Sequence, residues 1–573
     1  MSEINKKDII GLLETIAVYL ELKDENPFKI SAYRKAAAAL ERDNRSIADI
    51  DDYTQIKGIG KGTAAVIHDY LENEESETLQ QLEEEIPAGL IPLLKLPGLG
   101  GKKLSKLYQE LGITDRESLQ RAAEDGRVES LEGFGKKSVE KLLQSLKESG
   151  KRPERLPLAT MVPVADKIES HLDMINAIVK YSRAGSMRRM RETIKDIDYI
   201  IATESPEEVR DELLNLPDVK EVISNGLAKV SITIADVYDI NVDFRIVEEK
   251  EFATTLHHFT GSKDHNVSMR QLAKTRGEKI NEYGVDIEET GETLTFNTET
   301  DFFKHFGLHY IPPQARENTG EIKAFQDPQG LIEEKDIRGD LHMHSTWSDG
   351  GQSIEEMVIR ARQKGYDYIA ITDHSKYLRV ANGLNEARLR EQRKEIERLN
   401  AKYDDIHIFA GVEMDILPDG TLDFTDDFLK ELDFVIGAIH SAFNQSKEQI
   451  MKRLNTAMDN PYVSLIAHPT GRLIGRRQGY EADVNQLIER AAKTGTALEL
   501  NANPNRLDLS SEWVSLAQQK NVPIAINTDA HSYQMLEHMT YGVGTAIKGW
   551  QKPENVLNTW PLEQLQSFIN NKK

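Results

Sequence analysis

The first 150 residues of the chain carry apolar positions at helical spacing. Segments such as ISAYRKAAAALERD (30–43) and TLQQLEEEI (78–86) place Ala, Leu and Ile three and four residues apart, which is the period of an amphipathic helix. No segment here alternates convincingly between apolar and polar residues, as a half-buried strand does. We therefore predict a helical region over residues 1–150.

Alternating segments begin after the proline-containing stretch KRPERLPLATMVP (151–163). KDIDYIIAT (195–203), KVSITIADV (229–237) and INVDFRIV (240–247) place apolar side chains at every second position, which predicts strands. Helical segments lie between them, so residues 151–315 form a second, mixed unit. The polar stretch ENTGEIKAFQDPQG predicts an interdomain linker over residues 316–335.

Seven short apolar runs separated by helical segments occupy residues 336–573. They are RGDLHMH, YDYIAITDH, IHIFAGVEMD, DFVIGAIH, VSLIAH, TALELNAN and VPIAINTDAH. Buried parallel strands of a β/α barrel have this pattern, and such barrels carry their catalytic groups at the carboxyl ends of the strands. Six of the seven runs end in His, Asp or Glu. The whole chain is thus predicted to be multidomain, of mixed α+β and α/β class.

Composition restricts the chemistry. The formal net charge of −23 argues against broad electrostatic attachment to DNA or to an anionic membrane. With no cysteine in the chain, any metal must bind to His, Asp and Glu. No apolar run is long enough to span a bilayer, and the first residues lack a signal-peptide cleavage site. We expect a monomer in the cytoplasm with no membrane partner.

Three Gly-apolar-Gly turns repeat in the helical region. They are IKGIGKG (56–62), LPGLGGK (96–102) and LEGFGKK (131–137), each followed by a helix-like segment. Backbone amides at the start of such a helix can meet a phosphate without net positive charge. The turns resemble helix-hairpin-helix motifs, which hold the DNA backbone. The predicted DNA contacts in these turns are Gly58, Gly60, Gly98, Gly100, Gly133 and Gly135.

A second group of residues has the pattern of a nucleotidyl-transfer site. A Gly185-Ser186 turn and a cluster of arginines precede Asp196 and Asp198, whose spacing places both carboxylates on one strand face. Asp243 lies on another predicted strand. If the two strands are neighbours, the three acids converge on a two-metal site for phosphoryl transfer. A solvated strand face is the alternative.

These segments resemble the family X DNA polymerases. Residues 1–315 are similar to DNA polymerase beta, and the whole chain resembles bacterial family X polymerases that carry a C-terminal PHP domain. The resemblance implies a nucleotidyltransferase palm with a fingers- or thumb-type subdomain, dNTP substrates and Mg²⁺ or Mn²⁺ at the three aspartates. HFTGS (258–262) matches the nucleotide-binding YFTGS motif of the family, with His in place of Tyr. The implied nucleotide contacts are Gly185, Ser186, Arg189, His258, Phe259, Gly261, Asn266 and Arg270.

The resemblance extends to the N-terminal region. Lys29, Tyr33 and Lys35 match residues that contact a 5′ phosphate in the family, with exposed helix cations as the alternative reading. The family position that supplies a Schiff-base lysine holds Val66. An imine-forming amine is therefore missing at this position.

The third candidate site is rich in histidine. Of the eight histidines from residue 342 onward, six fall at predicted strand ends, and so many on one rim are too costly to desolvate for a purely structural role. This ligand set suits two or three ions of Mn²⁺, Zn²⁺ or Fe. The positions also match the ligand pattern of PHP (polymerase and histidinol phosphatase) phosphoesterase domains. The implied ligands are His342, His344, Asp349, His374, Glu413, His440, His468, Asp529 and His531.

The reading that unites these sites is a DNA repair enzyme. The palm is predicted to fill short gaps in primer-template DNA, and the PHP barrel (336–573) to act as a 3′→5′ exonuclease at 3′ ends. Endonuclease activity at abasic sites is left open. Two alternatives remain, a DNA-end binding scaffold with inactive sites and a small-molecule phosphatase fused to a nucleotidyltransferase with a non-DNA substrate.

Overall fold

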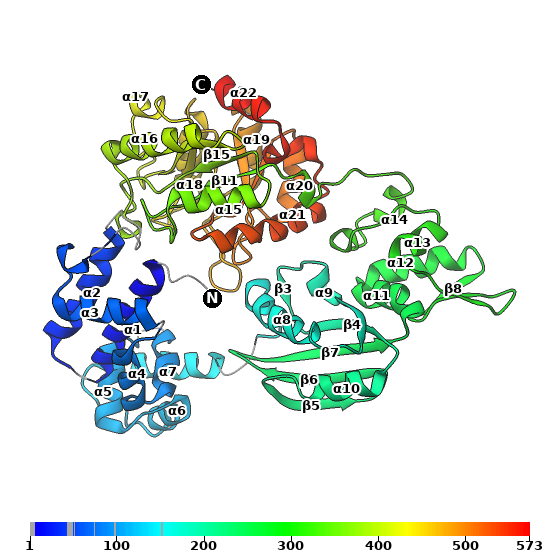
Figure 1. Cartoon of the computed structure of the whole chain (residues 1–573), viewed down its shortest axis with the longest axis horizontal. Coiled ribbons are helices and arrows are strands. Elements are labelled where there is room, and N and C mark those ends of the chain that lie inside the picture. The colour runs from blue at the N-terminus through cyan, green and yellow to red at the C-terminus, as the bar shows by residue number, and fades with distance from the viewer. Residues whose placement is uncertain are drawn as a thin grey trace.

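A computed structural model describes residues 6–572 except for 24, 43–49, 51, 74, 97–98 and 150–152. Four parts follow one another along the chain (Figure 1): a helical region (6–149), a palm (156–251), a thumb-type subdomain (252–326) and a barrel (339–572). In Figure 1 the barrel lies above the palm, and the thumb-type subdomain extends to the right. No helix within the described residues is long and apolar enough to cross a membrane.

The helical region forms one apolar core. Its α-helices are α1 (Lys6–Leu22), α2 (Pro27–Arg42), α3 (Lys61–Asn73), α4 (Glu77–Glu85), α5 (Gly101–Leu111), α6 (Arg116–Glu124) and α7 (Lys136–Ser149). Residues from all seven pack into a single buried cluster. The apolar stripes seen in the sequence therefore face one another, as amphipathic helices require.

The palm is built on a five-stranded mixed sheet. Its strands are β2 (Ile178–Arg183), β4 (Ile197–Thr203), β5 (Val219–Asn225), β6 (Lys229–Ala235) and β7 (Asp239–Val247), in the order β2-β4-β7-β6-β5. Helices α8 (Leu158–Leu172) and α10 (Pro206–Leu214) share one buried cluster with these strands. The three predicted strands are the three inner ones. The sequence did not reveal β2 and β5, which form the two edges of the sheet.

The thumb-type subdomain is small and packs around aromatic residues. It contains α11 (Phe252–Thr260), α12 (Lys263–Lys274), α13 (Glu299–His305) and the short strands β8 (Glu278–Ile280), β9 (Val285–Ile287) and β10 (Thr293–Leu294). Phe302, Phe303 and Phe306 of and beside α13 anchor its core.

The segment expected to be a linker is packed over its first part. Arg316 and Glu321 are fully buried, and Phe325 joins the core of the thumb-type subdomain. The polar composition of this stretch suggested a linker, but its polar side chains have buried partners. Arg316 binds Glu299, and Glu321 binds His265 at 2.7 Å. The subdomain thus includes α14 (Glu321–Ala324) before the chain crosses to the barrel.

The barrel has seven parallel strands. They are β11 (Gly339–Met343), β12 (Tyr368–Ile371), β13 (His407–Asp415), β14 (Phe434–Ala438), β15 (Leu465–Ile466), β16 (Ala497–Asn501) and β17 (Ile524–Asn527), and they pair in chain order. The end of the last strand lies beside the end of the first: the amide of His344, just after β11, donates to the carbonyl of Ala530, just after β17, at 2.8 Å. The sheet is a nearly closed barrel, as the seven apolar runs predicted.

Candidate functional sites

The palm acids meet at the centre of its sheet. Strands β4 and β7 are parallel neighbours, and their register places Asp198 directly beside Asp243. Asp196 lies two residues before Asp198, directly before the first residue of β4. The ammonium of Lys229 on β6 lies 2.9 Å from Asp243 Oδ2. The two strands that carry the acids are therefore neighbours, which is the condition under which the sequence predicted that the three acids converge.

The crowding of these carboxylates changes their acidity. Burial raises the pKa of Asp198 to about 7, and the charges of Asp243 and Asp196 push it in the same direction. Like charges this close favour protonation unless a cation lies between them. A divalent ion would relieve that repulsion, so the donor set fits the predicted Mg²⁺ or Mn²⁺.

The glycine turn lies against this acidic centre. Gly185 has φ of +58°, and a Cβ on it would lie 2.1 Å from Asp198 Oδ2. Only glycine combines that backbone conformation with so close an approach. Gly185 and Ser186 open the short helix α9 (Gly185–Arg188), so the turn brings their backbone to the edge of the acidic site.

The arginines after the turn join the palm to the thumb-type subdomain. The guanidinium of Arg189 donates to the carbonyl of Thr260 and, from Nε, to Glu317 at 3.1 Å. A Cβ on Gly261 would lie 3.2 Å from Arg189 Nη1. The structure thus brings the Gly-Ser turn and the HFTGS segment together. In this arrangement Arg189 faces the Glu317 carboxylate.

The other predicted nucleotide contacts surround the same place. The Asn266 side chain donates to the carbonyl of His258 at 2.7 Å, and Arg270 is exposed on α12. The guanidinium of Arg245, next to the acidic centre on β7, lies 4.5 Å from the Phe259 ring centroid. Burial lowers the pKa of His258, so its imidazole is neutral at pH 7.

In the barrel, the nine predicted ligands gather at the carboxyl ends of the strands. Glu413 is central: its carboxylate lies 2.9 Å from His374 Nδ1, 3.1 Å from His440 Nε2 and 2.9 Å from His468 Nε2. His344 Nε2 lies 3.6 Å from Glu413 Oε2 and 3.2 Å from Asp529 Oδ1, so it connects the two carboxylates. Strand ends far apart in the sequence therefore direct their side chains into one cluster.

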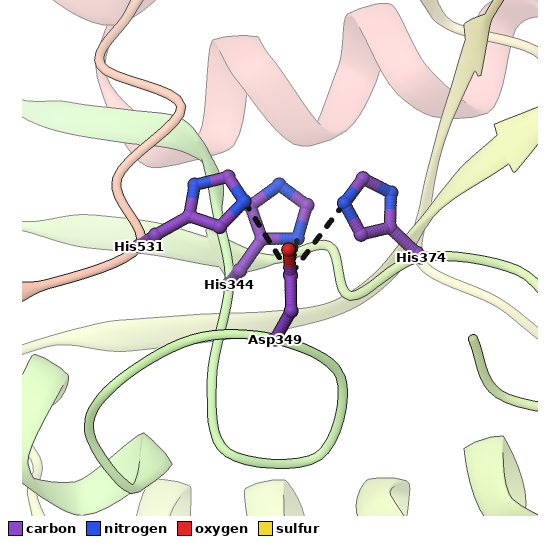
Figure 2. A group of neighbouring side chains, drawn as sticks. All are labelled: His344, Asp349, His374 and His531. Carbon is purple, nitrogen blue, oxygen red and sulfur yellow. Dashed lines mark ion pairs between the residues drawn. The ribbon is translucent and has the colours of Figure 1, made fainter. Parts of the chain in front are cut away.

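A second carboxylate organises the outer part of the cluster. Figure 2 shows the imidazoles of His344, His374 and His531 around the carboxylate of Asp349. The nearest nitrogens of these three rings lie 4.0, 3.6 and 3.4 Å from Asp349 Oδ1. His344 and His374 each also belong to a further group that could hold an ion. Three overlapping groups are thus present: His344, Asp349, His374 and His531; His342, His344 and Asp529; His374, Glu413 and His440.

The cluster has the electrostatics of a metal centre. Burial and the neighbouring His531 and His374 lower the pKa of His344 to about 3. Burial also opposes protonation of His440, yet Glu413 and Asp415 raise its pKa to about 10. Among the described side-chain atoms, Glu413 Oε2 and His344 Nδ1 are buried without a hydrogen-bond partner. Buried oxygen and nitrogen atoms that lack a hydrogen-bond partner can offer their lone pairs to a divalent ion.

The sequence did not identify Glu499, which lies behind the ligands. It is fully buried on β16, and its Oε1 lies 2.7 Å from His342 Nδ1. It also accepts from the backbone amide of His468 at 2.7 Å. A carboxylate in this position fixes the ring nitrogen that faces a metal. The available signal was a charged residue in the middle of the apolar run TALELNAN.

The hairpin turns lie at helix starts in the helical region. Gly60, Gly100 and Gly135 each directly precede a helix, α3, α5 and α7 respectively. A Cβ on any of these three would meet no atom within 4 Å, so their backbone faces open space. Gly58 and Gly133 have φ of +118° and +94°, which favour glycine. Gly98 lies outside the described residues.

The predicted 5′-phosphate contacts differ in exposure. Lys29 and Lys35 are exposed on α2, whereas Tyr33 is only 7% exposed and packs in the helical core. Phe28, which the sequence reading did not single out, is 86% exposed beside Lys29. The two lysines are thus available to a ligand, and the body of the Tyr33 ring is not.

Comparison with known families assigns the parts of the chain. Residues 4–76 match the helix-hairpin-helix domain and residues 90–148 the SAM-like helix-hairpin-helix tandem. Residues 255–317 match the DNA polymerase beta thumb, and residues 340–503 the PHP domain. The predicted fold classes of these parts are confirmed.

Individual relatives extend the comparison to the whole chain. The DNA polymerase/3′-5′ exonuclease PolX of Bacillus subtilis is 58% identical over 566 residues, which cover 99% of both chains. Rat DNA polymerase lambda is 23% identical over 53% of this chain and 55% of its own length. A probable phosphatase of Caldicellulosiruptor bescii is 30% identical over 40% of this chain and 93% of its own length.

Proposed function

Because the chain belongs to the family X DNA polymerases with a C-terminal PHP domain, the family of the Bacillus subtilis relative, we infer that it is a DNA polymerase and a 3′→5′ exonuclease. It binds DNA and uses divalent metal ions. The observation that supports this function is the presence of two clusters of possible metal ligands in one chain, aspartates at β4 and β7 of the palm and histidines with carboxylates on the rim of the barrel.

We propose that the palm adds deoxynucleotides to a 3′-hydroxyl at short gaps. Asp196 and Asp198 would hold both metal ions, and Asp243 would help to bind and orient the 3′-hydroxyl. The β4–β7 register supports these roles, since it places Asp198 beside Asp243. Gly185, Ser186 and Arg189 would bind the triphosphate, and the HFTGS segment would border the sugar and base.

The barrel would hydrolyse the terminal phosphodiester. Its nine ligands would hold two or three ions of Mn²⁺, Zn²⁺ or Fe, and Glu499 would orient His342 through the 2.7 Å contact. Ions bound at either site supply Lewis-acid stabilisation of charge on the phosphate. The same site would also carry out any cleavage at abasic positions, which chelation of the metal ions should then abolish.

The helical region would hold the DNA backbone near both sites. The open amides that follow Gly60, Gly100 and Gly135 suit phosphate binding without sequence readout. Lys29 and Lys35 would receive the 5′ phosphate of a gap, which is why gapped DNA is the proposed substrate. Both centres are built from residues of one chain, which supports action as a monomer. The proposed location is the cytoplasm, at the nucleoid when the enzyme acts.

A single assay tests this function. The purified protein is incubated with a labelled primer on gapped DNA, with and without dNTPs, in Mg²⁺, Mn²⁺ or Zn²⁺. We expect extension with dNTPs, shortening without them, and neither in EDTA, because both centres lack a cation to balance their carboxylates when the metals are removed. Extension or shortening that persists after complete chelation would contradict the metal assignments.

Cleavage at abasic sites is expected to proceed without a covalent intermediate. The residue at the lyase position, Val66, is 7% exposed within the helical core and has no amine. Borohydride added to the protein on abasic DNA should therefore trap no adduct. Any cleavage should disappear with EDTA and with His344→Ala. An adduct that forms in EDTA would show that another lysine acts as the nucleophile.

A further inference from the structure

The palm segment that directly follows Arg189 is held by the barrel. This segment, Met190–Glu192, is called here the palm turn. Figure 1 places α9 of the palm below helix α21 (Met539–Lys548) of the barrel. The two parts meet through residues far apart in the sequence. Met190 and Lys548, which share a hydrogen bond, are 358 positions apart.

Met190 fits into a gap that a glycine leaves in α21. A Cβ built on Gly544 would lie only 1.9 Å from Met190 Sδ, and 3.3 Å from its Cγ. The side chain of Met190 therefore lies where any larger residue at position 544 would be. The backbone of Met190 itself has φ of +49°, a conformation that non-glycine residues rarely adopt without support from their surroundings.

Lys548 supplies part of that support. Its ammonium donates to the carbonyl of Met190 at 3.2 Å, one turn along α21 from Gly544. Lys548 is part-buried, and burial lowers its pKa to about 8. Taking this cation partly out of water costs free energy, which its hydrogen bond to Met190 offsets.

A second contact holds the other end of the palm turn. Glu192 Oε1 lies 2.7 Å from Arg472 Nη2, and Arg472 also donates to the carbonyl of Leu507 within the barrel. The loop of Arg472 follows the metal-ligand position His468. Arg472 therefore joins the barrel to the palm.

These contacts lie between cavities. A cavity of about 960 Å³ borders Arg191 and Lys548, and another of about 540 Å³ borders Met190 and Gly544. The palm turn therefore borders open volume at Met190 and at Arg191, while elsewhere Leu507 of the barrel packs into the apolar core of the palm.

We propose that Lys548 and Gly544 of the barrel are positioning residues for the polymerase, because they hold the palm turn and thereby fix the place of the adjacent Arg189, to which the proposed function assigns the triphosphate. The inference rests on the proposed polymerase function. It predicts that the nuclease domain sets the affinity of the polymerase for dNTP through residues that touch neither substrate nor metal.

The first test removes the hydrogen bond. Lys548→Met is compared with Lys552→Met, which changes an exposed lysine just beyond the same helix. On a single-nucleotide gap we expect Lys548→Met to raise the KM for dNTP about tenfold, the loss expected for a bond from a charged donor. Its kcat should change less than about twofold, and shortening of a single-stranded primer should not change.

The second test exchanges size across the contact. Gly544→Ala should raise the KM for dNTP, because its methyl group displaces Met190, and adding Met190→Ala should bring the KM back toward the wild-type value. Such compensation is the signature of direct contact and does not arise from general destabilisation. If the wild-type protein extends primers but all these variants keep its KM, the inference is wrong. A wild-type protein that fails to extend would instead overturn the proposed function.

Discussion

Asp196→Asn combined with Asp198→Asn is expected to abolish primer extension and to leave 3′ shortening intact. His344→Ala combined with His468→Ala should have the opposite effect. Each pair removes ligands from one centre only, since the palm acids and the barrel cluster share no residue. We expect each affected rate to fall by at least about a thousandfold, because metal-assisted stabilisation of the transition state provides several kcal/mol.

Matched substitutions control for charge and fold. Glu204→Gln changes an exposed carboxylate just after β4, and His407→Ala removes a histidine at the opposite, amino end of β13. Both variants should retain both activities in the same gapped-DNA assay. Loss of extension and shortening together in a folded double mutant would contradict the assignment of two independent sites.

Glu299→Gln is expected to weaken the junction between the palm and the thumb-type subdomain. The Glu299 carboxylate lies 2.6 Å from Arg188 Nη2 and 2.6 Å from Arg316 Nη1. Removing its charge takes the counter-ion from the buried guanidinium of Arg316 and from the part-buried one of Arg188, a loss that typically costs about 3–5 kcal/mol. Hydrogen exchange of the α13 amides measures this loss locally, with exposed Glu289→Gln as the control.

The same carboxylate gives the junction a defined acid sensitivity. Burial alone raises the pKa of Glu299, but Arg316 and Arg188 outweigh it and lower the value from 4.5 to about 2. A lowered pKa stabilises the folded state above the unfolded value and loses that contribution as the pH falls through the folded value. Protection of α13 should therefore fall between about pH 4.5 and pH 2, by about 3 kcal/mol. Glu289→Gln should keep this pH dependence, and Glu299→Gln should lack it.

Local sequence patterns were sufficient for the parts of the fold that have buried strands. The seven barrel strands are largely apolar runs, and the six candidate ligand histidines lie in or shortly after them, so the pattern predicted a common rim, while the resemblance to PHP domains supplied the full ligand set. In the inner palm strands, apolar side chains alternate with polar ones, which also marked them as strands. In contrast, most side chains of the edge strand β5 are exposed, and it gave no alternating signal.

The sequence could not show contacts whose partners lie far apart. Nothing near Met190 indicates that Gly544 leaves space for it, and nothing near Arg472 indicates Glu192. Arg316 and Glu321 look like solvated linker residues until their buried partners are known. Tyr33 likewise appears among polar neighbours, yet its ring faces the helical core. The surroundings of these residues depend on tertiary packing, which produces no periodic pattern of apolar residues in the sequence.

Closure of the barrel has a consequence for synthesis of the chain. His344 follows the first strand, whereas Asp529 and Ala530 follow the seventh, and all three meet only where β17 returns to β11. Domains fold as units in the order in which the ribosome releases them. The palm acids are already complete by residue 243, almost 300 residues before the last barrel ligand, His531. A growing chain therefore gains its means of degrading DNA after it has assembled the acids for building DNA.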